Sequence, residues 1–206
     1  MKKLYTLLLL SAATIQANAQ GDMESWQSYS VGFPATSLEK PTGWSCPDSL
    51  AAEYSLLIGG NEKQLFKTTD SHSGSFAAKV FSRPQGSLGT MPGIFTNGTM
   101  SVDISTLEFS LSGGTVISGR VDYVSAWIKY KPKGNDSANF GVRALIAGAA
   151  SDGSDSIVGI GSVFIHATPS YTQVSVPVVY FQAGTTPNRL QILFASSDAT
   201  EMLSGG

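Results

Sequence analysis

Cysteine, charge and long periodic apolar runs are all scarce in this sequence. Only one cysteine occurs among the 206 residues, so no disulfide can form within the chain and the core must supply its stability. Charged residues make up only 14%, which argues against a helical bundle or coiled coil. Low mean hydropathy argues against a polytopic membrane protein. Apolar residues make up 42%, enough for one domain with a buried core.

The single cysteine, Cys46, lies beside Pro47 and has no basic residue next to it in the sequence. A reactive thiol needs neighbours that lower its pKa. Cys46 is therefore expected to be an inert thiol in the core or in a loop.

The first residues have the pattern of an export signal. A basic start, Met1–Lys3, precedes an apolar stretch, Leu4–Ile15, and the small-x-small sequence Ala17–Ala19. This pattern predicts a signal peptide over residues 1–19 and a mature domain over residues 20–206. Cleavage changes the formal net charge from −2 to −4, because it removes two lysines and no acidic residue. A negative surface without a basic stripe argues against nucleic-acid binding.

Short alternating or β-branched runs dominate the mature chain, with Gly, Ser, Asn, Asp and Pro between them. Several such runs at short spacing predict an antiparallel sandwich or barrel, and the lack of long helical patterns argues against a parallel α/β fold. The expected strands are Ser25–Val31, Ala77–Ser82, Ile94–Phe95, Met100–Ile104, Asp122–Tyr130, Ala138–Ile146, Ile157–Ile165, Thr172–Tyr180 and Leu190–Ser196.

The alternation divides the strand Asp122–Tyr130 into two faces. Val124, Ala126, Ile128 and Tyr130 form an apolar face, and the other face is a mixture of aromatic and polar residues. Three further strands divide in the same way, so each is expected to bury one face and expose the other. Pro177 lies inside a predicted strand and requires an edge position or a bulge there.

Five segments follow one another along the chain: PTGW (Pro41–Trp44), DSHSGSFA (Asp70–Ala77), RVDYVSAWIKYKP (Arg120–Pro132), SVPVVY (Ser175–Tyr180) and RLQILFASS (Arg189–Ser197). In this order they resemble the putative carbohydrate metabolism domain of secreted Bacteroidota proteins. The resemblance covers most of residues 22–200 and implies a β-jelly-roll like those of carbohydrate-binding modules. A mature chain that begins with Gln20 is also similar to proteins exported to the Bacteroidota cell surface.

Domains of this kind usually end in a strand that reads roughly Gly-Ser-x-Leu-x-Val-Asp-Asp, whereas this sequence stops at Gly206 before any such segment. The expected fold is therefore an antiparallel β-sandwich of jelly-roll type that lacks its C-terminal closing strand. The aspartates of that segment have no counterpart here.

Enzymatic interpretations find little support. A glycosidase needs two carboxylates at a defined separation, and the sequence gives no reason for any pair, such as Glu53 and Glu108, to meet. His72 and His166 are far apart and indicate neither a catalytic triad nor a zinc site. Gly159 and Gly161 lie inside an apolar strand with no helix after it, which indicates close packing or a bulge rather than a nucleotide loop. No catalytic residue is predicted.

A sugar site needs a flat aromatic ring beside polar donors and acceptors, because sugars present apolar C–H faces surrounded by hydroxyls. Tyr123, Trp127, Lys129, Arg143 and Gln191 would supply these groups on one sheet face, if the strands pair in the order that the resemblance implies. The alternative is that Trp127 only covers the core, as most tryptophans do.

The favoured function is a secreted noncatalytic carbohydrate-binding module at or outside a bacterial envelope. The alternatives are a structural or adhesive surface module without a sugar ligand and a small glycan-active hydrolase. The turn Ser151–Asp155 offers oxygen ligands for a structural calcium ion, but it lacks the full spacing of a helix-loop-helix calcium site and is more typical of a solvated hairpin. The identity of the glycan and the oligomeric state stay open.

Overall fold

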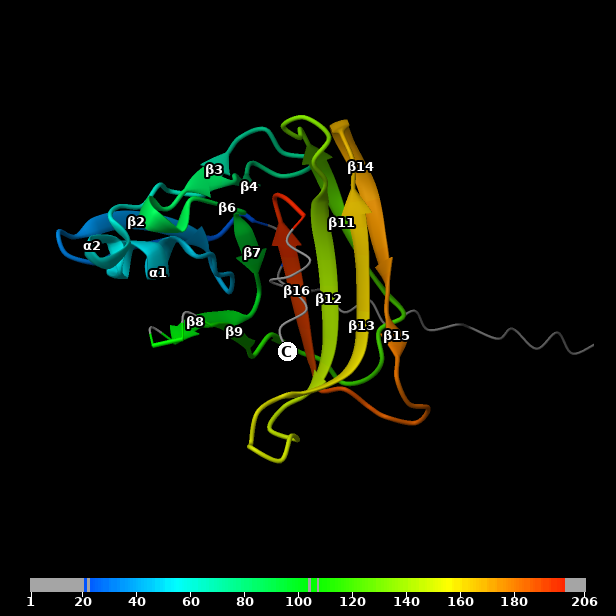
Figure 1. Ribbon diagram of the computed structural model, residues 1–206. Helices are drawn as coiled ribbons and strands as arrows, with labels where there is room; N and C mark the ends of the chain where they lie inside the picture. Colours follow the sequence, from blue (N-terminus) through cyan, green and yellow to red (C-terminus); the bar gives the residue numbers. More distant parts are fainter. Residues whose placement is uncertain (1–20, 22, 104, 107, 199–206) are drawn as a thin grey trace, which may run out of the picture.

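The computed structural model describes residue 21 and residues 23–103, 105–106 and 108–198. The predicted signal peptide and the expected absence of a closing strand concern residues outside these ranges. Within them the chain is mostly β-strand in antiparallel sheets, with short helical segments only (Figure 1). The expectation of an all-β, antiparallel, sandwich-like fold is confirmed.

The largest sheet contains six strands in the described residues. Its order is β10-β16-β12-β13-β15, and β7 also pairs with β16. All of these pairs are antiparallel. The strands are β7 (Ile94–Thr96), β10 (Thr115–Val116), β12 (Ala138–Ile146), β13 (Ser156–Ile165), β15 (Val179–Tyr180) and β16 (Arg189–Ala195).

A second layer lies against this sheet. It contains the antiparallel pair of β11 (Tyr123–Tyr130) and β14 (Thr168–Pro177), and β14 packs over β12 and β13. Figure 1 shows β11 and β14 behind the tall strands β12 and β13.

The N-terminal half forms a lobe beside the sandwich (Figure 1). Its hairpins are β1 (Trp26–Val31) with β2 (Thr36–Pro41), β3 (Leu65–Thr68) with β4 (Ala77–Val80), and β5 (Arg83–Pro84) with β6 (Thr90–Met91). The helical segments are α1 (Asp48–Glu53), α2 (Ser55–Ile58) and the 3-10 turn η1 (Gly86–Leu88). A further hairpin, β8 (Thr99–Asp103) with β9 (Glu108–Ser112), projects below the lobe.

Each predicted strand has a counterpart, with Ile104 outside the described residues. The prediction missed β2, β3, β9 and the shortest strands, together with α1 and α2. These helices occupy only a few turns, so their sequence shows no long helical period. The helical segment still has a clear stop, because Gly59 adopts the left-handed conformation, with φ 80°, directly after α2.

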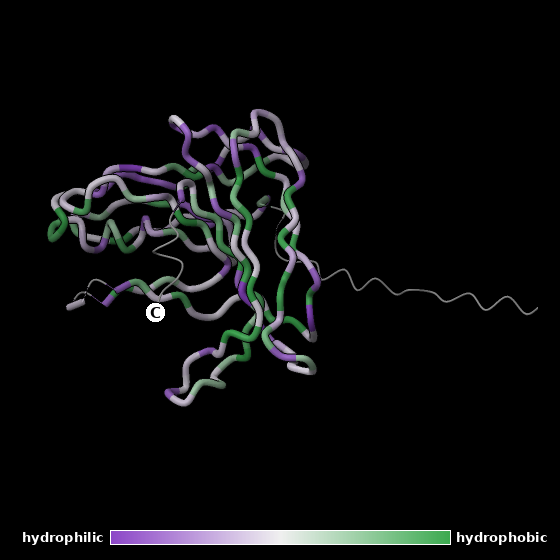
Figure 2. The backbone as a smooth tube through the Cα atoms, turned by 45° about the vertical axis from the view of Figure 1, so that its right-hand side comes forward, coloured by the Kyte–Doolittle hydropathy of each residue, from purple (hydrophilic) through white to green (hydrophobic). Residues whose placement is uncertain are grey.

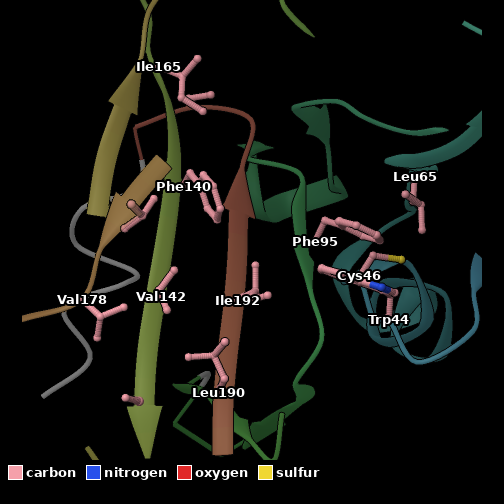
Figure 3. Packing of buried hydrophobic residues seen from close by; sticks show 13 residues of the cluster. Trp44, Cys46, Leu65, Phe95, Phe140, Val142, Ile165, Val178, Leu190 and Ile192 are labelled. Atoms are coloured by element: carbon pink, nitrogen blue, oxygen red, sulfur yellow. The ribbon is translucent and has the colours of Figure 1, made fainter. Parts of the chain in front are cut away.

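The core lies between the two layers, as the alternation predicts. Phe140 and Val142 of β12 belong to its buried cluster, and Val124 and Ala126 of β11 pack against that cluster. Figure 3 shows the side chains of β12 and β16 extending into this space, with Trp44, Phe95 and Cys46 closing it on the lobe side. Figure 2 shows hydrophobic and polar residues alternating along the long strands.

Pro177 marks the point where the chain changes sheets. It is the last residue of β14, which pairs with β11 and has no other strand partner among the described residues. After Val178 the chain continues as β15, which pairs with β13. The predicted edge position of Pro177 is therefore confirmed. Gly161 of β13 lies below this crossing, where a Cβ atom would come within 2.1 Å of the Pro177 carbonyl oxygen, so the glycine is a packing requirement.

Asp48 and Cys46 are buried in the lobe. The carboxylate of Asp48 accepts hydrogen bonds from the backbone N–H groups of Gln64 (2.8 Å) and Leu65 (3.1 Å), which ties α1 to β3. Burial raises the pKa of Asp48 above its usual value. Cys46 is also buried, and desolvation raises the pKa of its thiol to about 12. The predicted inertness of Cys46 agrees with this environment, because almost no thiolate forms at neutral pH.

Candidate functional site

The face of β11–β14 that points away from the core carries a row of aromatic and polar side chains, which we call the outer strip. In β11 the row consists of the residues that alternate with the buried ones. The register places Ser125 opposite Ser175 and Trp127 opposite Gln173. The outer strip comprises Tyr123, Ser125, Trp127 and Lys129 of β11, and Tyr171, Gln173 and Ser175 of β14.

Trp127 is the largest side chain of the outer strip, and it is 47% exposed. The imidazole of His72 stacks on its indole with ring centroids 3.8 Å apart and an interplanar angle of 7°. His72 comes from the loop between β3 and β4, so a segment distant in sequence supports the ring. The indole is therefore held in a fixed orientation while about half of its surface remains in contact with solvent.

The same loop is attached at a second point by Asp70. Its carboxylate accepts a hydrogen bond from the Lys129 ammonium at 2.6 Å, and its backbone carbonyl accepts one from the Tyr171 hydroxyl. The hydrogen bond with Asp70 raises the pKa of Lys129. Burial, followed by the negative charge of Asp70, raises the pKa of Tyr171. Lys129 and Asp70 thus neutralise each other at this end of the outer strip.

Tyr123 lies at the other end and is 64% exposed. It precedes Trp127 by four residues on the same face of the strand, which corresponds to about 13 Å of extended chain. Between the two rings, the hydroxyls of Ser125 and Ser175 lie 2.6 Å apart and hydrogen-bond to each other. The outer strip therefore presents two exposed rings with hydroxyl and amide groups between them.

The structure does not bring all five predicted binding residues together. Tyr123, Trp127 and Lys129 share the outer strip, whereas Arg143 and Gln191 lie on β12 and β16 of the other sheet. Both alternate with core residues of their strands, so they lie on the far side of the sandwich from the outer strip. The expectation of one common sheet face is wrong, because β11 pairs with β14 and not with β12 or β16.

The environments of these two residues also differ from that of the outer strip. Gln191 is only 2% exposed, and its side-chain amide lies 3.5 Å from the backbone carbonyl of Leu111. Arg143 is partly buried, and burial lowers the pKa of its guanidinium. Gln191 is therefore a packing residue beneath β9, and neither side chain can contact a ligand bound at Trp127.

Sequence reasoning missed the loop residues of the site, Asp70 and His72, and the β14 residues Tyr171 and Gln173. The alternation in β14 could have identified Gln173, because it lies on the polar face of its strand. Nothing in the sequence indicates that the β3–β4 loop reaches Trp127, since that contact joins segments more than fifty residues apart.

The other candidate residues of the sequence analysis belong to different elements. His166 hydrogen-bonds to Ser137 at 3.0 Å, and Glu53 and Glu108 are exposed on α1 and β9. No group of three or more His, Cys, Asp or Glu side chains within the described ranges could hold a metal ion.

In the predicted calcium turn, the acidic side chains cap backbone groups. Asp155 accepts hydrogen bonds from the N–H groups of Gly113 and Gly148, and Asp152 accepts one from Ser154. This geometry is that of a hairpin turn, and calcium binding there stays a prediction.

Comparison of the chain with family models, curated proteins and solved structures found no match in any of the three. In the part of the chain that the structure describes, no helix is long and apolar enough to cross a membrane.

Proposed function

We propose that this protein is a secreted noncatalytic carbohydrate-binding module that acts at or outside a bacterial envelope, with the outer strip as its binding surface. The observation that carries the proposal is the exposed, fixed indole of Trp127 on a sheet whose opposite face is packed into the core. A binding surface needs such a side chain, because ordering a flexible one on binding costs entropy.

The chemistry of the outer strip fits that of a sugar. Tyr123 and the face of the Trp127 indole that His72 does not cover offer flat apolar surfaces for the C–H faces of pyranose rings. Gln173 lies directly opposite Trp127 and provides both a donor and an acceptor, and Ser125 and Ser175 provide hydroxyls. Because Lys129 is paired with Asp70, an uncharged glycan fits this surface better than a strongly anionic one.

The length of the outer strip favours a chain of sugars over a single one. The two residues are separated by about 13 Å of extended strand, which exceeds the width of a single sugar ring. A linear glycan that follows β11 would contact both rings and the polar groups between them. We therefore expect affinity to rise with oligosaccharide length until both rings are covered.

One feature of the sequence supports a location outside the cytoplasm. The first residues have the pattern of a signal peptide. The net charge of −4 after cleavage at the predicted site supports a partner other than nucleic acid.

The test is affinity electrophoresis and calorimetry against a panel of neutral polysaccharides with the variant Trp127→Ala. Phe164→Ala is the matched control, because Phe164 is an aromatic residue of β13 with nearly the same exposure, 48%. Loss of a central tryptophan costs about 2 kcal/mol or more, which corresponds to roughly thirtyfold in affinity. Unchanged binding by Trp127→Ala, or an equal loss in Phe164→Ala, would rule out the outer strip as the binding surface.

A further inference from the structure

An apolar pocket lies between the helical segment α1–α2 and the hairpin β8–β9, and it shares no residue with the outer strip. Its cavity volume is about 150 Å³. Leu50, Tyr54 and Ile58 form the helical wall, and Met100, Val102 and Phe109 form the hairpin wall.

The sequence pattern explains why both walls are apolar. In β8–β9 the register pairs Met100 with Leu111 and Val102 with Phe109, which gives the hairpin one apolar face. Its other face is polar and pairs Ser101 with Ser110 and Asp103 with Glu108. On the helical side, Leu50, Tyr54 and Ile58 follow each other at intervals of four, the spacing of a helix stripe. Two apolar faces thus meet across a space that their side chains do not fill.

The side-chain N–H groups of the two glutamines that line the pocket are engaged with the protein, whereas the side-chain oxygen of Gln85 is buried without a hydrogen-bond partner. The side-chain amide of Gln64 donates to the Met91 carbonyl at 2.9 Å, and that of Gln85 donates to the Glu62 carbonyl at 2.8 Å. No Asp, Glu, Lys or Arg of the described residues lines the pocket. A charged or highly hydroxylated molecule would lose its hydration there in exchange for the unpaired acceptor of Gln85, so a sugar is a poor occupant.

We propose that this pocket binds a small uncharged apolar molecule, the size of a single aromatic ring or a short alkyl group. Protein interiors leave few voids larger than a water molecule, because wall atoms without neighbours lose dispersion contacts. An apolar cavity of about 150 Å³ is large enough to bind benzene. An apolar occupant would restore contacts for both walls at once.

The mouth of the pocket supports the same ligand class. Leu57 and Phe109 line the pocket and are also exposed, so an apolar ligand can enter without opening the core. Figure 2 shows hydrophobic segments at the end of the lobe that is farthest from the sandwich. This site is independent of the proposed glycan surface, and the failure of either proposal leaves the other unaffected.

The methionines provide a direct readout. Met91 and Met100 line the pocket, whereas Met23 packs against the main core. The experiment is a titration of the full chain, labelled with ¹³C at the methionine methyl groups, with toluene as the probe. We expect saturable shifts of the Met91 and Met100 signals and an unchanged Met23 signal. No shift, or equal shifts at all three positions, would overturn the proposal.

Variants that fill the pocket provide the second part of this test. Ala51 lines the pocket on α1, and Ala51→Phe places a ring inside it, so the toluene shifts should disappear while the Met23 signal keeps its native position. Val102→Phe fills the pocket from the hairpin wall if Ala51→Phe does not fold. Leu56→Ala is the control, because Leu56 is exposed and does not line the pocket. Toluene shifts that persist in the filled variant, or that vanish in Leu56→Ala, would contradict binding in this pocket.

Discussion

Replacing two tryptophans separately by alanine should have very different effects on stability. Trp44 is 5% exposed and stacks on Phe95 with centroids 4.4 Å apart. Trp44→Ala removes a buried ring and leaves a cavity, which costs about 3–5 kcal/mol. Trp127 is half exposed, so Trp127→Ala removes mainly the contact between the indole and His72. Burial of about half of a tryptophan surface, together with one aromatic pair, predicts a loss of about 1–2 kcal/mol.

The assay for this prediction is equilibrium unfolding in urea, followed by far-UV circular dichroism so that loss of a tryptophan does not alter the signal. Wild type and both variants should share one m-value, which makes their midpoints comparable. A loss for Trp127→Ala as large as that for Trp44→Ala would refute the reasoning. It would mean that Trp127 is part of the packed core and that the outer strip is not a free surface.

Two further predictions concern pH. The folded-state pKa of Cys46, about 12, lies above its ordinary value of 9.0, so its contribution to stability is complete below pH 9 and is lost as the pH rises toward 12. Between pH 8 and 10.5, the free energy of unfolding measured in urea should fall by about 2 kcal/mol more for wild type than for Cys46→Ala. An equal fall for the two proteins would contradict the raised pKa. The pKa of Asp48 is also raised, from 3.8, so wild type should lose stability relative to Asp48→Asn as the pH rises from 4 to 7. If the difference in free energy of unfolding between wild type and Asp48→Asn does not change with pH, the pKa of Asp48 is not raised by folding.

The strands whose bounds the sequence predicted most completely are those whose alternation is long. Residues Asp122–Tyr130 alternate over a whole strand, so the alternation alone identifies Val124 as inward and Trp127 as outward. The hairpins of the lobe have strands of two to six residues, and the sequence predicted β1 and β4 but missed β2 and β3, because so short an alternation is hard to distinguish from chance. The helical segment was missed for a similar reason, because its stripe of Leu50, Tyr54 and Ile58 spans only about three turns.

Only part of the candidate site was predicted, because placing its residues requires different kinds of information. Tyr123, Trp127 and Lys129 belong to one strand, and strand alternation is enough to place them together. Arg143 could be added only by knowing which strands pair, and β12 pairs with β13 and β16 instead of β11. His72 reaches Trp127 through a loop, and loop positions depend on tertiary contacts that no local pattern encodes.

The most direct test of the proposed binding surface is a titration of the ¹⁵N-labelled protein with neutral oligosaccharides of increasing length, followed at the indole N–H signals. The chain contains three tryptophans, Trp26, Trp44 and Trp127, and only Trp127 belongs to the outer strip. We predict a saturable shift of the Trp127 signal that grows with oligosaccharide length, while the Trp44 signal stays in place. A ligand that shifts Trp26 or Trp44 but not Trp127, or the absence of any shift across the series, would contradict glycan binding at the outer strip.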